Sequence, residues 1–326
     1  MFRSYCICFG PVVQLNRTSD SGSESRGFES RRGHNMKNIS VFFKDSKPLA
    51  QLVGLFFLFL VGFIAAGGMQ LLLPFAGDTP STIRGQLAVQ GCSQILIFLL
   101  PAVLFAVIYH DGAISFHKVF TDGKSWILGL IAVVVLLLLV PLNDFLTWWN
   151  GSWNLGAWDQ PLRNMSDDST RMVERLLSLT SVGDLLLQLL VVALIPAVCE
   201  ELFFRGALQQ TFHRWFGNSH VAILATALVF SLAHGDIFGL VPRFLLGIML
   251  GYLFFLSGSM VVNVCAHFFN NAMVVVMFYF YHTGVLSQPP NEPMFLPWGM
   301  VLMFTLAAAL LVAEYFLKKN LKRHTK

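Results

Sequence analysis

The stretch LLLQLLVVALIPAVCEELFFRG (residues 185–206) joins a long apolar run to three charged side chains. About 20 consecutive apolar residues cross the hydrocarbon core of a bilayer as a helix. The run therefore predicts a membrane-spanning helix, and Glu200, Glu201 and Arg205 lie at its end. Ionisable groups at such a depth are costly and usually face a partner or a water-filled space, so their position indicates a functional site.

The composition of the whole chain agrees with a membrane protein. Of the 326 residues, 55% are hydrophobic and 12% are charged, about half the charged share of a soluble domain. The net charge of +4 is small, so we expect no nucleic-acid partner. The five cysteines are odd in number and scattered, which does not describe a disulfide framework.

Hydrophobic segments recur along the chain and predict an all-α, polytopic membrane protein of about eight transmembrane helices. They lie near residues 50–74, 87–109, 126–147, 184–213, 219–237, 240–256, 259–281 and 296–317. The basic tail KKNLKRHTK (318–326) places the C-terminus in the cytoplasm, and an even number of spans places the N-terminus there too. We expect an integral protein of a lipid bilayer, namely a bacterial inner (plasma) membrane.

The N-terminal residues differ in kind from the rest. RTSDSGSESRGFESRRGHN (17–35) is rich in Ser, Arg and Gly and has no apolar period, so residues 1–35 are predicted to be disordered. This segment resembles translated upstream non-coding sequence, with the natural start at Met36. Residues 36–326 are then interpreted as a single membrane domain.

The longest loop, residues 148–183, is predicted to lie outside the cytoplasm. It opens with four tryptophans within 148–158, and such rings suit the headgroup region. SDDSTRMVERLLSL (166–179) predicts a capped amphipathic helix that rests on the membrane surface. We interpret this loop as an interfacial lid without chemistry.

Further polar residues follow in the next hydrophobic segments. FSLAH (230–234) ends in His234. NVCAHFFNN (263–271) places Asn263, His267 and Asn271 at spacings of four, which is one face of a helix. Asn270 is expected to point elsewhere.

The positions of these residues predict that they meet. Glu200 precedes the expected turn at Gly217 by 17 residues and His234 follows it by 17, so both lie about 25 Å from that turn in an antiparallel pair. His267 and Asn271 lie roughly 14–20 Å from the next expected turn, at Ser257–Gly258, on the same side. We therefore expect a conical catalytic cavity that opens to the cytoplasm.

The spacing of Glu200, Glu201 and Arg205 predicts different roles for the two glutamates. Glu201 and Arg205 have the i, i+4 order that favours an ion pair, whereas Glu200 is rotated about 100° away and is left available as a general base. Asn263 is expected to orient the imidazole of His267. Pro196 is expected to bend the helix before Glu200.

Two glycines are expected to bring another helix close to this face. In GIMLG (247–251), Gly247 and Gly251 have the small-xxx-small spacing of closely packed membrane helices. We expect them to lie across from His267 and Asn271.

The residues EELFFR (200–205), FSLAH (230–234) and HFFNN (267–271) resemble the EExxxR, FxxxH and HxxxN motifs of the CAAX protease and bacteriocin-processing family, also called the Abi family. The resemblance covers roughly residues 180–285, which would form the catalytic core. It implies a glutamate-dependent membrane endopeptidase similar to the type II CAAX prenyl protease.

By this resemblance, Glu200 and His234 would deprotonate a water molecule, and His267 and Asn271 would donate hydrogen bonds to the oxyanion. Glu201 and Arg205 would support the site. The substrate would be a peptide or protein in or at the membrane, either prenylated or bacteriocin-like.

A metal is the open question of this site. Enzymes of this kind are often classed as metalloproteases, and Glu200, His234 and His267 could form a two-histidine, one-carboxylate zinc site. The sequence has no HExxH pair, the usual way to place two zinc ligands and a base on one helix. The interpretation we favour uses no metal or other cofactor, and zinc is the alternative.

Two other functions compete with the protease. A catalytically silent immunity or binding protein would keep the motifs as a structural polar network. A transporter or proton channel would use buried Glu and His side chains as a relay. The polar groups stop at one depth, and we see no internal repeat of the kind that inverted-repeat transporters carry.

Overall fold

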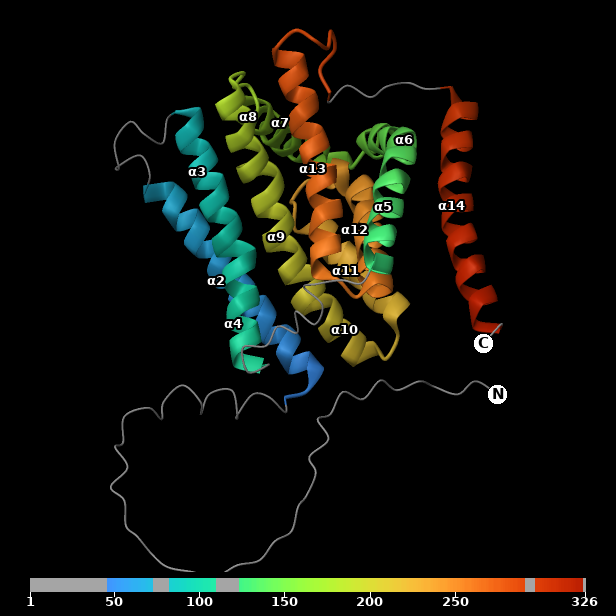
Figure 1. The fold of residues 1–326 in the computed structure, drawn as a ribbon. Coiled ribbons are helices and arrows are strands. Elements are labelled where there is room, and N and C mark those ends of the chain that lie inside the picture. The colour runs from blue at the N-terminus through green and yellow to red at the C-terminus, as the bar shows by residue number, and fades with distance from the viewer. Residues whose placement is uncertain (1–45, 73–81, 110–122, 291–296, 325–326) are drawn as a thin grey trace, which may run out of the picture.

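The computed structural model describes residues 46–72, 82–109, 123–290 and 297–324, and this part of the chain contains helices and no strand (Figure 1). The N-terminal segment predicted to be disordered lies outside the described residues. The all-α class is confirmed.

Five helical spans among the described residues are long and apolar enough to cross a membrane. In chain order their elements are α2 (Pro48–Leu72); α3 (Ile83–Gln94), η3 (Ile95–Leu99) and α4 (Leu100–Tyr109); α8 (Val182–Gln188), η5 (Leu189–Leu194), α9 (Ile195–Glu201), η6 (Leu202–Leu208) and α10 (Gln209–Phe216); α12 (Leu240–Ser257); and α13 (Met260–His282). The protein is therefore an integral membrane protein.

Three further apolar elements accompany these spans. A bent pair, α5 (Gly123–Leu138) and α6 (Val140–Gly151), makes a sixth span if it is counted as one. The shorter apolar helices are α11 (Ser219–Leu232) and the first part of α14 (Trp298–His324). The total of eight spans stays a prediction, because these last two apolar stretches are shorter than a full crossing.

The bend between α5 and α6 differs from the single straight segment predicted over 126–147. The two helices meet at 52°, and Pro141 lies in the first turn of α6. A proline has no backbone N–H and clashes with the carbonyl one turn earlier, so it ends or kinks a helix. As a result, α6 turns over the upper part of the bundle (Figure 1).

Two other prolines lie inside spans that continue through them. Pro101 follows the π-helical segment η3, and Pro196 follows the π-helical segment η5. A π turn inserts one extra residue into the helical ladder. We infer that this wider turn accommodates each missing N–H, because the span containing Pro196 runs unbroken from Val182 to Phe216.

Tight turns join α10 to α11 and α12 to α13, where the sequence predicted them. Gly217 and Gly258 end their helices with φ of 65° and 62°, a left-handed conformation that glycine adopts without steric cost. Asn218 and Ser259 then cap the next helices by accepting backbone N–H groups. Both turns lie at the lower end of the bundle (Figure 1).

The long loop of residues 148–183 holds a 3₁₀ turn, η4 (Gly156–Trp158), and the helix α7 (Asp159–Leu176). The predicted amphipathic helix is present, but its predicted start at Ser166 is wrong, because α7 begins seven residues earlier at Asp159. The Asp159 carboxylate accepts a hydrogen bond of 2.7 Å from Arg163 one turn later. Pro161 is tolerated because the first turn of a helix needs no N–H donor.

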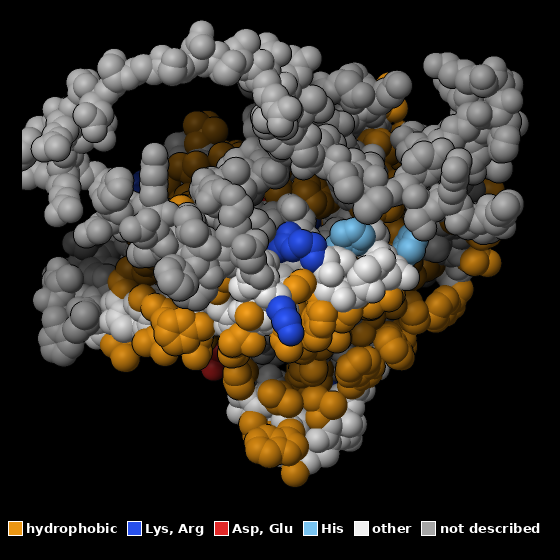
Figure 2. Space-filling view, turned by 90° about the horizontal axis from the view of Figure 1, so that it is seen from below, with side chains coloured by type: hydrophobic (Ala, Val, Ile, Leu, Met, Phe, Trp, Pro, Cys, Tyr) orange, Lys and Arg blue, Asp and Glu red, His pale blue; other side chains and the backbone are white. Residues whose placement is uncertain are grey.

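The interior is aromatic where η3, η6 and α11 meet. Phe98 packs against Phe203 and Phe204, with ring centroids 5.6 Å apart in both pairs, and Phe204 packs against Phe230 at 5.1 Å. The outside of the bundle exposes many large apolar side chains, as a lipid-facing surface requires. Seen from below, a small group of basic and histidine side chains lies next to a broad hydrophobic surface (Figure 2).

Gly247 and Gly251 form a close contact, but with a different helix from the one predicted. A β-carbon on Gly247 would lie 3.0 Å from the Cα and Cβ of Ala227, and one on Gly251 would lie 2.8 Å from the Cγ2 of Ile223. Both neighbours belong to α11 rather than α13. These glycines therefore pack α12 against α11.

Candidate active site

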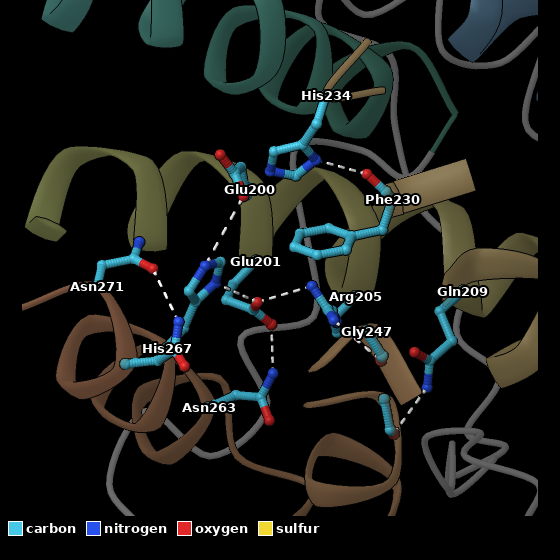
Figure 3. A network of polar contacts seen from close by, with 12 residues as sticks. Glu200, Glu201, Arg205, Gln209, Phe230, His234, Gly247, Asn263, His267 and Asn271 are labelled. Carbon is cyan, nitrogen blue, oxygen red and sulfur yellow. Dashed lines mark hydrogen bonds and ion pairs between the residues drawn. The ribbon is translucent and has the colours of Figure 1, made fainter. Parts of the chain in front are cut away.

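The polar residues selected from the sequence gather where three helices approach one another (Figure 3). Glu200 and Glu201 end α9 and Arg205 lies in η6. His234 follows the end of α11, and α13 contributes Asn263, His267 and Asn271. The sequence separates these elements by tens of residues, and the hairpin turns at Gly217 and Gly258 bring them together.

Glu201 and Arg205 form the ion pair that their spacing predicted. Arg205 Nη1 lies 2.7 Å from Glu201 Oε1, and both side chains are fully buried. Arg205 Nη2 also donates a 3.2 Å hydrogen bond to the carbonyl of Gly247. The guanidinium therefore links the site to α12 as well as neutralising Glu201.

Glu201 is the centre of the network, because its carboxylate accepts from three side chains (Figure 3). Besides Arg205, His267 donates from Nδ1 to Oε1 over 2.8 Å, and Asn263 donates from Nδ2 to Oε2. Asn263 was expected to orient His267 directly, but its amide contacts Glu201 instead. The orientation of His267 is set by Glu201, a contact that the sequence did not predict.

Glu200 is buried but is not paired with Arg205. Its Oε2 lies 3.8 Å from His267 Nε2, and its carboxylate also interacts electrostatically with the nearby imidazole of His234 (Figure 3). The two adjacent glutamates therefore have different neighbours. Glu201 holds the arginine, whereas Glu200 faces two histidines.

The proton positions on the two histidines follow from their partners. His234 Nδ1 lies 2.8 Å from the carbonyl of Phe230, and His267 Nδ1 lies 2.8 Å from the Glu201 carboxylate. Carbonyl and carboxylate oxygens only accept, so both Nδ1 atoms carry hydrogen. Each neutral ring then has its lone pair on Nε2, as required of a proton acceptor.

Burial differs across the site. Glu200 and His267 are only 5% and 2% exposed, whereas Asn271 is half-buried and His234 is exposed. The site is therefore open on the side of His234 and closed around His267.

Phe230 is a site residue whose contacts the sequence did not predict. Its ring centroid lies 4.9 Å from that of His234, 6.0 Å from that of His267 and 5.0 Å from Arg205 Cζ. The aromatic face attracts the guanidinium, and the ring fills the space between the two imidazoles. The signal was present, since Phe230 is the phenylalanine of FSLAH.

Asn271 lies one helical turn after His267. Its Oδ1 accepts a 3.2 Å hydrogen bond from Asn270 Nδ2, so Asn270 touches the site only through its neighbour in the sequence. Because the amide oxygen is engaged, the Asn271 Nδ2 group is left on the opposite side of the amide as a donor.

Metal binding was considered with Glu200, His234 and His267 as ligands. Within the described part of the chain, no group of three or more His, Cys, Asp and Glu side chains is arranged to hold a metal ion. The outer contacts of the two imidazoles, from Nδ1 to an oxygen, are nevertheless of the type that supports metal-bound histidines.

The fold and the site define a polytopic, helical membrane protein with a buried cluster of Glu, His and Asn side chains. Residues 182–273 match the family model described as type II CAAX prenyl endopeptidase Rce1-like. This match confirms the resemblance seen in the three motifs, and it includes every residue selected above for the site. No curated protein and no solved structure matches the chain.

Proposed function

We propose that this protein is an intramembrane endopeptidase that hydrolyses peptide bonds of membrane-associated or lipidated peptides. The observation that carries the proposal is the different environment of two adjacent buried glutamates. Glu201 is neutralised by Arg205 at 2.7 Å, while Glu200 lies beside two imidazoles and remains available to take a proton. The family match over residues 182–273 supports a protease of the CAAX type.

In the proposed reaction, a water molecule donates hydrogen bonds to the Glu200 carboxylate and to Nε2 of His234. Glu200 takes the proton as the water oxygen attacks the scissile carbonyl carbon. The tetrahedral intermediate collapses when the C–N bond breaks, and Glu200 returns its proton to the leaving amine. General base catalysis of this kind contributes about 10²–10⁴-fold to a rate.

The oxyanion is proposed to accept hydrogen bonds from His267 and Asn271. Nδ1 of His267 is held by Glu201, so His267 donates from Nε2 to the oxyanion only when both ring nitrogens carry hydrogen, and Asn271 donates from its amide Nδ2. Donors aimed at a developing charge in a buried site stabilise it by about 2.7–4 kcal/mol each.

The proposed mechanism uses no metal, because a carboxylate next to an imidazole can activate water by itself. Glu200, His234 and His267 would be the ligands of a zinc ion, which would supply a Lewis acid for the same water. Metal analysis of the purified protein by mass spectrometry tests this choice. One zinc per chain, lost together with activity on chelation, would replace the metal-free mechanism.

The substrate and the orientation are also proposals. The proposed orientation has the end of the bundle that carries α10 in the cytoplasm, and the positive-inside rule applied to Arg214 and the basic C-terminal tail supports it. A prenylated or bacteriocin-like peptide would then reach the site from the cytoplasmic side of a bacterial inner membrane.

Comparing the peptides of membranes that express the wild type and Glu200→Ala tests the function. We expect uncleaved precursors to accumulate with Glu200→Ala, and Glu200→Gln to behave the same way, because an amide cannot take a proton. A silent binding protein would instead tolerate Glu200→Gln, since the amide preserves size and hydrogen bonding. Normal processing in both variants would reject the protease.

A further inference from the structure

His234 depends on the segment that follows it, because it lies outside any helix. α11 ends at Leu232, and His234 occupies the turn that leads to the 3₁₀ turn η7 (Ile237–Gly239). The next residue, Gly235, has a φ of 70°. The helix α11 therefore fixes the backbone only before His234. The backbone after His234 is fixed by the path from Gly235 to the start of α12.

One side chain from a distant helix holds both ends of η7. Asn150, in the last turn of α6, donates from Nδ2 to the carbonyl of Ile237 over 3.0 Å and accepts the backbone N–H of Val241 over 2.8 Å. Asn150 is 0% exposed. Its amide supplies the donor and the acceptor that these two backbone groups need.

The other contacts of this turn are made by residues close to it in the sequence and by α7, from which Ser166 bonds the Asp236 carboxylate. Asp236 accepts a 2.8 Å hydrogen bond from Arg243, and Ser231 Oγ donates to the carbonyl of Leu240. The Arg163 guanidinium of α7 lies 4.3 Å from the ring centroid of Phe238. Asn150 bonds the backbone at Ile237 and Val241 from α6, the second helix of the bent pair α5 and α6.

We propose that Asn150 is a positioning residue for His234, an inference that rests on the proposed role of His234 in water activation. Asn150 fixes the turn after His234 and thereby holds the imidazole against Glu200. It lies outside residues 182–273, the segment that matches the protease family. The part of the chain before this segment thus contributes to the geometry of the site.

Gln188 provides a matched control. It is also 0% exposed, and its Nε2 donates to backbone carbonyls in another turn, that of Leu176 at 3.0 Å and that of Leu179 at 3.4 Å. Gln188→Ala therefore removes a buried amide that holds a loop, without touching the turn at His234. Comparing it with Asn150→Ala separates positioning of His234 from general stabilisation.

The first measurement does not need activity. Hydrogen–deuterium exchange of the full-length protein in detergent should show faster exchange over residues 234–241 in Asn150→Ala, and no change there in Gln188→Ala. Asn150→Asp, which keeps the size and the acceptor but loses the donor, should show the same increase if the alanine variant folds poorly. Unchanged exchange over 234–241 in both Asn150 variants would overturn the proposal.

The second measurement is cleavage of a quenched fluorescent peptide with a farnesylated C-terminal cysteine motif. We expect kcat to fall about 10–100-fold in Asn150→Ala, as for a catalytic group displaced by about 1 Å, with KM changed less than threefold and the pH profile of kcat/KM shifted. Gln188→Ala should keep kcat and the profile. Equal losses of kcat in the two variants would show that Asn150 only stabilises the fold. If the wild type does not cleave the peptide, the proposed function is contradicted, and hydrogen–deuterium exchange alone then tests whether Asn150 positions the turn after His234.

Discussion

Replacing Arg205 by methionine should be among the most destabilising substitutions in the chain. Methionine keeps the apolar length of the side chain but removes the cation that lies 2.7 Å from Glu201, and both partners are fully buried. Glu201 would keep only Asn263 and His267 as partners. Removing one member of a buried ion pair costs about 3–5 kcal/mol, because it leaves an uncompensated charge.

The loss can be measured as thermal unfolding in detergent. For a chain of 326 residues, 1 kcal/mol corresponds to roughly 1.5 °C, so Arg205→Met should lower Tm by about 4–8 °C. The double variant with Glu201→Gln and Arg205→Met should regain a large part of this loss, because no buried charge is left without a partner.

Arg205→Lys separates the charge of this residue from its shape. A lysine ammonium is a point charge without the planar fork of the guanidinium. It should neutralise Glu201 but lose the hydrogen bond to the carbonyl of Gly247, which spans 3.2 Å in the native protein. We expect the Tm of Arg205→Lys to lie between the Tm of the wild type and that of Arg205→Met. A fall in Tm below 3 °C for Arg205→Met, or a double variant no more stable than the single one, would refute this account of the pair.

Three further outcomes follow from the structure. Glu200→Gln should reduce peptide cleavage at least about 100-fold while Tm changes by less than 3 °C; activity near that of the wild type would exclude Glu200 as the base. Gly247→Ala should lower Tm, because the new β-carbon would lie 3.0 Å from Ala227 on a facing backbone; a Tm equal to that of the wild type would show that the two helices separate easily. The hydrogen bond from Arg163 lowers the pKa of the Asp159 carboxyl below its usual value, so this contact stabilises the folded loop above about pH 4 and is lost as pH falls through the lowered pKa. Limited proteolysis of the loop of residues 148–183 should therefore become faster in acid, and a rate independent of pH between 7 and 3 would contradict this.

Local patterns in the sequence predicted the features that depend on one helix or one turn. The apolar runs predicted the membrane spans, and the short breaks between them predicted the turns at Gly217 and Gly258, where glycine adopts the left-handed helix end freely. The pair of Glu201 and Arg205 followed from their i, i+4 spacing. In each case a few neighbouring residues contain the whole interaction.

Contacts between helices were beyond these patterns. Gly247 faces α11 rather than α13, and Asn263 bonds Glu201 rather than His267, because rotation of one helix against another is decided by packing. Apolar composition predicted one continuous segment over residues 126–147, whereas the structure has two helices, α5 and α6, with a bend between them. Asn150 had no sequence signal, since its partners are backbone groups 87 and 91 residues away.

The π-helical segment η6 begins directly after Glu201 and contains Arg205. Because a π segment accommodates one additional residue by turning less per residue than the roughly 100° of an α-helix, deletion of Gly206 should restore regular winding and leave α10 facing nearly the same directions. The aromatic residues at its end, including Trp215 and Phe216, would then keep their directions, while the helix became shorter by one residue. Chimeras with related proteins should therefore exchange residues 182–216 as one unit, so that the additional residue and the wide turn that holds it stay together.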